Sequence, residues 1–150
     1  MGRALTMTRT EGTNSETGAA VVEFALVAPL LFLLIFGIID LGRAYSTLNR
    51  LAASVREGAR LAAVLPNPAS SGSQAQIRQT VRQFSPSRID GQPISDGQIV
   101  ITFNQAAGTV TVAVQAYPFQ LVTPLAGVVG LRVIPVTREA TFRWERAAIP

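Results

Sequence analysis

Cysteine, histidine and lysine are absent from this chain. Without cysteine there can be no disulfide and no thiolate metal site, although an oxidising compartment is not excluded. Histidine is the commonest general base and metal ligand. A serine nucleophile is usually activated by a neighbouring histidine or lysine, and this chain has neither. We therefore expect no catalytic residue, no metal site, no cofactor and no small-molecule substrate, and we do not expect an enzyme.

Nucleic-acid binding is the next class to consider, because the net charge is +4 and the isoelectric point is about 11.0. All 13 basic residues are arginine, and they are scattered along the chain between acidic residues. The sequence also has no recognised nucleic-acid motif, no metal-loop spacing of its acids and no glycine-rich phosphate loop. We interpret the arginines as a solvated surface and expect no nucleic-acid partner; a membrane-tethered DNA binder is a minor alternative.

Hydrophobic residues make up 48% of the 150 residues, and many of them form one block from Ala19 to Ile39. Glu23 is the only charged residue in that block. As a helix the block would be ~31 Å long at ~1.5 Å per residue, close to the ~30 Å hydrocarbon core of a bilayer. The sequence therefore predicts one membrane span, followed by room for one small domain.

The junction before the span is informative, because a polar stretch over residues 1–18 ends in Gly18 and Glu23 stands five residues further on. A secretory signal has a shorter apolar core of ~7–15 residues, so a cut near residues 44–46 has little support. A carboxylate within a span costs up to ~2.5–3.5 kcal/mol at the bilayer centre. A cut after Gly18 would give Ala19 a charged amino group that can pair with Glu23 of the same or a neighbouring subunit and set the register of packed helices. Alternatively, Glu23 reaches the headgroups or favours the helix start.

Further residues from Gly18 to Ala63 form an ordered pattern: Glu23-Phe24, Pro29, Gly37, Asp40, Gly42-Arg43 and Arg56-Glu57-Gly58-Ala59. In this pattern the segment resembles the TadE-like minor pseudopilins of the tight-adherence (Flp) type IV pilus. The resemblance implies cleavage between Gly18 and Ala19 by a prepilin peptidase, and a role in pilus assembly. We assign Glu23 and Phe24 to subunit register and recognition. The implied partners are membrane lipid, the peptidase, other pilin or pseudopilin subunits and the assembly machinery.

Pro29 lies inside the predicted span, where it removes a backbone donor and clashes with the preceding turn. We expect a helix kink there, which would help a subunit pass from bilayer to filament. A membrane proline that neighbouring helices tolerate is an equally good interpretation.

The orientation of the span is contested by the arginines. Arg43, Arg50 and Arg56 follow the span closely, whereas only Arg3 and Arg9 precede it, so the positive-inside rule favours a cytoplasmic C-terminal side. The resemblance implies the opposite, with the leader inside, and we adopt that orientation: a single-pass protein of the bacterial inner membrane with an extracytoplasmic C-terminal domain. An uncleaved single-pass protein with an extracytoplasmic interaction domain is the alternative.

We divide the chain into a leader over 1–18, a helix over 19–65, a linker over 66–73 and a small domain over 74–150. Beyond the span, apolar residues recur at three- and four-residue steps until Pro66-Asn67-Pro68 ends the helix. The predicted stripe comprises Leu41, Ala44, Tyr45, Leu48, Ala52, Val55, Ala59, Ala62 and Ala63. It would pack on the head, although a basic helix lying on a membrane surface is a competing interpretation.

In the small domain we predict a short helix over 74–84, with Ile77, Val81 and Phe84 on one face. Strands over 98–103 and 109–114 should form a hairpin that Tyr117-Pro118-Phe119 ends, and a third strand should run over 131–145. Pro135 indicates an edge position or a bulge in that strand. The fold class is then α+β, a long N-terminal helix packed on a roughly three-stranded antiparallel sheet.

The connection before the third strand is apolar, and its larger residues are Leu121, Val122, Leu125, Val128 and Val129. If exposed, they could bind a partner or lie on the outer membrane leaflet. More often such residues cap a core, and this is the interpretation we favour.

Overall fold

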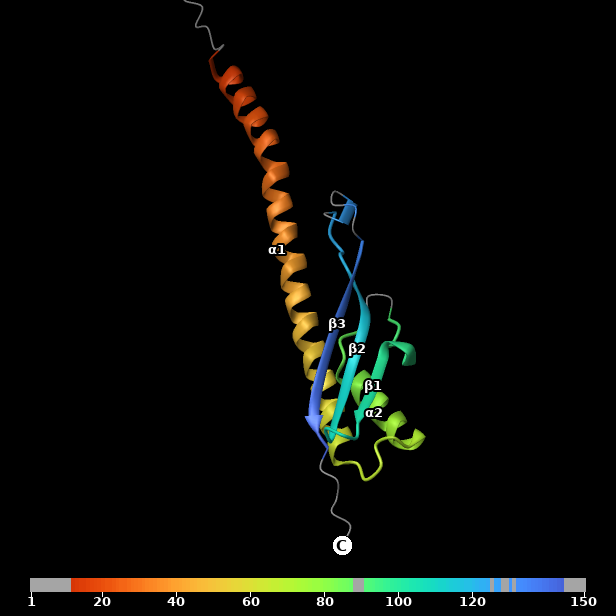
Figure 1. Ribbon diagram of the computed structural model, residues 1–150. Helices are drawn as coiled ribbons and strands as arrows, with labels where there is room; N and C mark the ends of the chain where they lie inside the picture. Colours follow the sequence, from red (N-terminus) through yellow and green to blue (C-terminus); the bar gives the residue numbers. More distant parts are fainter. Residues whose placement is uncertain (1–11, 88–90, 125, 128–129, 131, 145–150) are drawn as a thin grey trace, which may run out of the picture.

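The computed structural model describes residues 12–87, 91–124, 126–127, 130 and 132–144, and side chains from residue 17 onward. It has the predicted α+β architecture, in which a long helix packs on a three-stranded antiparallel sheet (Figure 1). The elements in chain order are α1 (Gly12–Val64), α2 (Ser71–Phe84), the 3-10 turn η1 (Asp96–Gln98), β1 (Ile99–Asn104), β2 (Thr109–Gln120) and β3 (Val133–Arg143).

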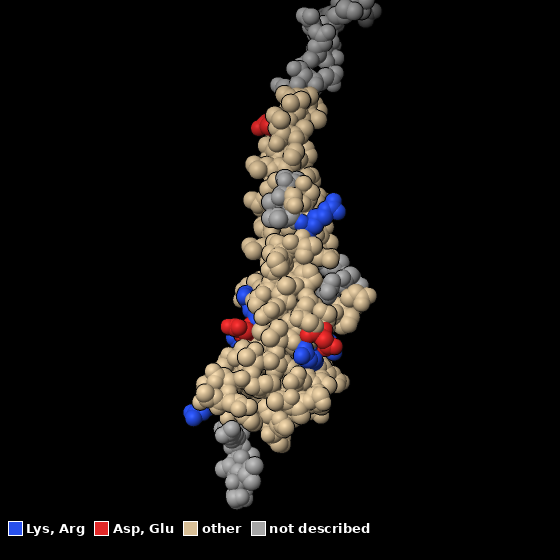
Figure 2. Space-filling model, turned by 45° about the vertical axis from the view of Figure 1, so that its right-hand side comes forward, with Lys and Arg blue, Asp and Glu red and all other residues tan. Residues whose placement is uncertain are grey.

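Helix α1 begins at Gly12, inside the predicted leader, and ends at Val64, next to the predicted end at Leu65. Its N-terminal half stands clear of the rest of the molecule (Figure 1), and its large apolar side chains from Val21 to Ile39 are largely exposed. This part is long and apolar enough to cross a membrane. Charged side chains gather instead over the lower half of the face seen in Figure 2.

The C-terminal half of α1 packs on the head through a face that agrees with the later part of the predicted stripe, since Val55, Ala59, Ala62 and Ala63 are buried. The earlier part of the stripe differs. Leu41 and Tyr45 are 72% and 68% exposed, so the prediction was wrong for both. Leu51 and Ser54 are fully buried although neither belonged to the stripe. The packed face includes small and polar residues, because the positions of α2 and the sheet decide which side of α1 is covered.

Helix α2 begins at Ser71, within the predicted linker, and the side chain of Ser70 caps it by accepting a hydrogen bond from the Ser73 N–H (3.2 Å). Ile77 and Val81 are fully buried, as predicted. Phe84, predicted on the same face, is 50% exposed because it is the last helical residue and extends beyond the core.

The sheet order is β1-β2-β3, and the predicted hairpin is present with Ile99 opposite Val114. However, β2 continues to Gln120 rather than ending before Tyr117. The register with β3 shifts between Val114 and Tyr117, and Ala116 adopts a φ of 50° at this bulge. The extra residue changes which positions face the helices, and so the strand no longer shows a simple alternation in sequence.

β3 is an edge strand, as Pro135 predicted, and Pro135 pairs with Pro118 of β2. Side chains from α1, α2 and all three strands form one core. Its buried members are Leu51, Val55, Ala59, Ala62, Ala63, Ile77, Val81, Ile94, Ile99, Val110, Val112, Val114 and Tyr117. This core fixes the head to the C-terminal end of α1.

Candidate functional site

The predicted processing site lies on the uncovered part of α1. Gly18 and Ala19 are both exposed, and a Cβ placed on Gly18 would meet no described atom within 4 Å. Glu23 is exposed as well, and it makes no hydrogen bond or ion pair with another described residue. Phe24 beside it is 66% exposed. These four residues are therefore accessible to a peptidase or another subunit, and their roles stay predictions.

Ala19 and Glu23 are four residues apart on one helix, so they lie on the same face. This spacing suits a contact between a new amino terminus at Ala19 and the Glu23 carboxylate. Pro29 follows on the same helix, which continues through it without a break. A kink at Pro29 stays a prediction.

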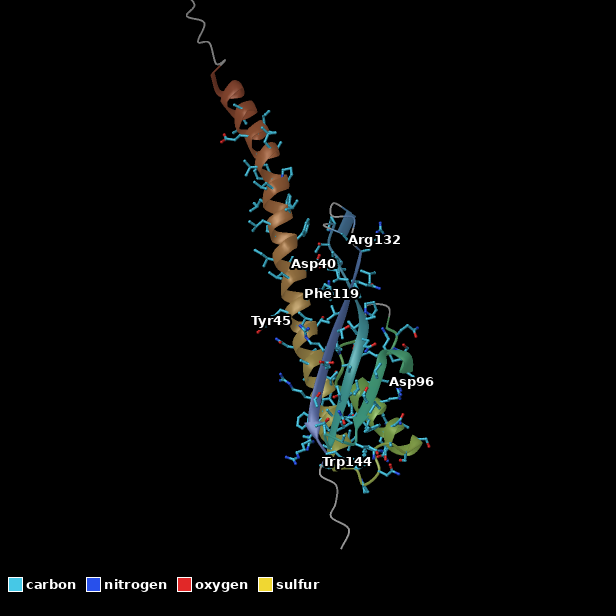
Figure 3. The ribbon with its side chains drawn as sticks, viewed as in Figure 1. Asp40, Tyr45, Asp96, Phe119, Arg132 and Trp144 are labelled. Atoms are coloured by element: carbon cyan, nitrogen blue, oxygen red, sulfur yellow. The ribbon has the colours of Figure 1, made fainter. Side chains whose placement is uncertain are left out.

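Asp40 forms a contact between α1 and the connection after β2 that sequence reasoning did not assign (Figure 3). Its side chain is only 3% exposed. The carboxylate accepts hydrogen bonds from the Thr123 hydroxyl and from the Val122 N–H, the latter at 3.3 Å. It also accepts one from Arg43, one turn further along α1, at 3.2 Å. We call Asp40, Arg43, Val122 and Thr123 the Asp40 clamp.

Arg43 extends the clamp to β2. Its guanidinium donates a hydrogen bond to the Gln120 carbonyl oxygen at 3.4 Å and lies 5.6 Å from the centre of the Phe119 ring. Asp40 and Arg43, just after the predicted span, thus join α1 to the C-terminal end of β2 and the connection that follows it. This contact holds the β2–β3 connection beside the end of the span.

The hydrogen bonds keep the Asp40 carboxyl charged. Burial by itself raises the pKa of this group, but the bonds from Thr123, Val122 and Arg43 lower the pKa by more. The net pKa of Asp40 therefore lies below its ordinary value. A charged Asp40 is the form that accepts all three hydrogen bonds.

Gly58 has a packing reason to be glycine. A Cβ there would lie 2.5 Å from Cγ2 of Val81 and 3.4 Å from Cγ1 of Val112. Such a contact is too short, so the Val81 side chain or the helix that carries it would have to move. In the Arg56-Glu57-Gly58-Ala59 element, Gly58 and Ala59 are therefore packing residues.

The charged half of that element lies at the surface. Arg56 is exposed, and Glu57 pairs with Arg60 at 2.5 Å. The hydrogen bond from Arg60 lowers the pKa of Glu57. An exposed pair one helical turn apart contributes little to stability.

Two arginines of α2 hold the segment before β1. Arg78 donates to the carbonyl oxygen of Asp96 at 2.7 Å and to that of Ile99. Arg82 donates to the Ile94 carbonyl oxygen at 2.9 Å and pairs with the Asp96 carboxylate. These arginine contacts hold the segment before β1 against α2.

Within the described part of the chain, no group of three or more potential ligand side chains could hold a metal ion.

The N-terminal part of the chain is similar to a known protein family. Residues 18–60 match the model of the TadE-like protein family. The match begins at Gly18 and includes Glu23, Asp40 and Gly58, whereas the rest of the head lies outside it. No curated protein and no solved structure matches the chain.

The family match and the apolar helix together suggest a Tad pilus-associated membrane protein. The TadE-like family is a structural family rather than a family of enzymes. Sequence reasoning noted Asp40 and Gly58 only as parts of a pattern. An acid directly after an apolar run, with an arginine three residues later, was the available signal for the clamp. A glycine among small apolar residues was the signal for close packing.

Proposed function

We propose that this chain is a minor pseudopilin-like membrane protein that a prepilin peptidase cleaves after Gly18, and that takes part in assembling a tight-adherence (Flp-type) pilus. The observation that carries the proposal is that the family match begins at Gly18, a glycine for which the fold has no structural need. Among the later glycines of α1, packing requires Gly58, whereas a Cβ at Gly37 or Gly42 would meet nothing within 4 Å.

Glycine within a helix is about 1 kcal/mol less favourable than alanine. At Gly18, six residues after the start of α1, this lowers the free energy needed to unwind the end of the helix. A peptidase needs an accessible, unwound peptide bond, and an exposed glycine near a helix end supports cleavage there. The new amino group at Ala19 would then meet Glu23, either in the same chain or across a subunit contact.

The proposed location is the inner membrane, with one span and an extracytoplasmic head. The leader must face the cytoplasmic peptidase in this proposal. The exposed apolar surface of α1 gives other pilin or pseudopilin helices a surface to pack on, in the bilayer or in a fibre. The partners would be the peptidase, membrane lipid, those subunits and the assembly machinery.

The test is the intact mass of the full chain made with and without a prepilin peptidase. We expect loss of residues 1–18 only when the peptidase is present, with Ala19 as the new first residue. Gly18→Ile should abolish the cleavage, whereas Gly42→Ala, at another exposed glycine of the same helix, should leave it unchanged. An intact Met1 in a native host that makes the peptidase would contradict the processing.

One observation favours an alternative function. α1 is helical on both sides of the Gly18–Ala19 bond, and a helical bond is a poor peptidase substrate until it unwinds. The alternative is an uncleaved single-pass membrane protein whose extracytoplasmic head binds another envelope component. In that case Gly18→Ile should change neither the size of the protein nor its activity.

A further inference from the structure

An apolar groove of about 350 Å³ lies between α1 and the far ends of β2 and β3. Its walls include Gly37, Leu41 and Leu48 of α1, and Phe119, Leu121 and Ile134 from the sheet side. Figure 1 shows these ends of β2 and β3 extending along α1 toward its N-terminal half. The buried core lies further along α1, and Val136 of β3 borders both the groove and the core.

The position of the groove relative to the span follows from its α1 wall. Gly37 belongs to the predicted span, Asp40 directly follows it, and Leu48 lies two turns beyond. At ~1.5 Å per residue, the Gly37 end of the groove is ~4.5 Å inside the level of Asp40. The clamp fixes Val122 at that level through its 3.3 Å hydrogen bond to Asp40. The groove therefore opens where the hydrocarbon core meets the headgroups.

Several apolar side chains at this end of the head are exposed, as expected for a surface that faces lipid. Val122 is 58% exposed and Val133 is 46% exposed. Leu121 is half-buried and lines the groove rather than the core, contrary to the capping interpretation. Leu125, Val128 and Val129 of the same connection lie outside the described residues. We call residues 121–124 together with residues 132–134 the β2–β3 tip.

Positive charge accompanies this apolar surface. The sequence has no acidic residue between Asp96 and Glu139. Arg132 is exposed at the tip (Figure 3), and among the described residues no carboxylate pairs with it. Its carbonyl oxygen accepts a hydrogen bond from the Leu121 N–H at 3.2 Å, which joins the two sides of the tip. Among the described residues, the carboxylate that bonds to the tip is that of Asp40, which is buried.

We infer that the β2–β3 tip is a binding site for an anionic phospholipid of the leaflet at the C-terminal end of the span. Acyl chains cover Val122 and Val133 and enter the Gly37 end of the groove, and Arg132, which does not line the groove, meets the phosphate of a lipid beside the tip. The groove begins at Gly37, inside the predicted span, so lipid can enter that end from the bilayer. Apolar surface combined with a nearby arginine is the combination that holds proteins at anionic interfaces. The inference rests on α1 crossing the membrane, and it does not depend on cleavage or orientation.

The absence of cysteine allows a direct depth measurement on the full chain. Val122→Cys, labelled with an environment-sensitive fluorophore, would be placed in nanodiscs that hold one copy and contain phosphatidylcholine with phosphatidylglycerol. Ile35→Cys in the span and Thr102→Cys on β1 are the matched controls, each at an exposed position. Lipids that carry a quencher should quench the labels at residues 35 and 122 and leave the label at residue 102 unaffected.

Each other result overturns the inference. If only residue 35 is quenched, the anchor stands but the tip does not touch lipid. If residue 35 is not quenched, the span fails and the inference fails with it. If residue 122 is shielded from a water-soluble quencher without being quenched from lipid, protein rather than lipid covers the tip.

The phosphate contact has its own test. The ratio of phosphatidylglycerol to phosphatidylcholine retained by the protein, counted by native mass spectrometry, should fall about fivefold in Arg132→Gln. Arg138→Gln changes an exposed arginine further along β3 and should leave the ratio unchanged. Inorganic phosphate should not displace the lipid. An unchanged ratio in Arg132→Gln, or equal loss in both variants, would remove Arg132 from the site.

Discussion

At the scale of single residues, the two glycines Gly58 and Gly42 of α1 show how context decides the effect of one methyl group. Gly58→Ala places a Cβ 2.5 Å from Val81, and we expect it to lower the free energy of unfolding by about 1–3 kcal/mol. Gly42→Ala meets nothing within 4 Å and should be neutral or stabilise by up to about 1 kcal/mol. Denaturant unfolding of the full chain in detergent measures both. Equal effects at the two positions would contradict the close packing at Gly58.

Asp40 is the other residue whose environment makes a sharp prediction. Asp40→Asn weakens three hydrogen bonds to a buried charge, and we expect a loss of about 1.5–3 kcal/mol. Hydrogen exchange of the Val122 N–H at neutral pH should become faster in this variant. Asp96→Asn, at an acid whose side chain is 70% exposed, should have a smaller effect.

The lowered pKa of Asp40 also fixes the pH dependence of the clamp. The folded-state pKa lies below the unfolded value of ~3.9, so the stabilisation is fully present above about pH 4 and is lost as the pH falls toward the folded-state pKa. Unfolding measured between pH 7 and pH 3 should show this loss in the natural chain. The loss should be reduced in Asp40→Asn, and an identical pH profile for the two proteins would exclude Asp40 as its source.

At the scale of elements, the contact between α1 and α2 predicts coupling. Val81→Ala removes the Cγ2 atom that a Cβ at Gly58 would strike. The double variant Gly58→Ala/Val81→Ala should therefore lose less free energy of unfolding than the sum of the losses in the two single variants. Phe84→Ala, at a half-exposed position of the same helix, should not relieve Gly58→Ala. A double-mutant cycle by denaturant unfolding distinguishes these outcomes.

The strands show where sequence patterns stop being informative. The hairpin of β1 and β2 was predictable, because both strands alternate and are close in sequence. The continuation of β2 to Gln120 was not, because the bulge after Val114 moves Tyr117 and Phe119 onto the face that Val110 and Val112 occupy. Only the pairing with β3 makes that extension a strand.

At the scale of the whole molecule, α1 is a single helix that would connect a bilayer to a head. We propose that the head is extracytoplasmic, and orientation can be measured in intact cells. Thr102→Cys, at an exposed position of β1, should react with a membrane-impermeant maleimide before the cells are opened. Reaction only after the inner membrane is permeabilised would favour the arrangement that Arg43, Arg50 and Arg56 suggest through the positive-inside rule.

The sequence by itself determined the apolar helix, its end before Pro66, and the α+β class. These features depend on hydropathy, on the spacing of apolar residues and on helix-breaking residues such as proline, all of which can be read from neighbouring positions in the sequence. The apolar stripe also indicated the buried positions Val55, Ala59 and Ala62. Tertiary structure alone decided where that buried face begins, because α2 and the sheet cover Leu51 and Ser54 and leave Leu41 exposed. It also decided that Asp40 meets Thr123, 83 residues away. Such contacts depend on how separate elements pack, and no local pattern in the chain encodes that arrangement.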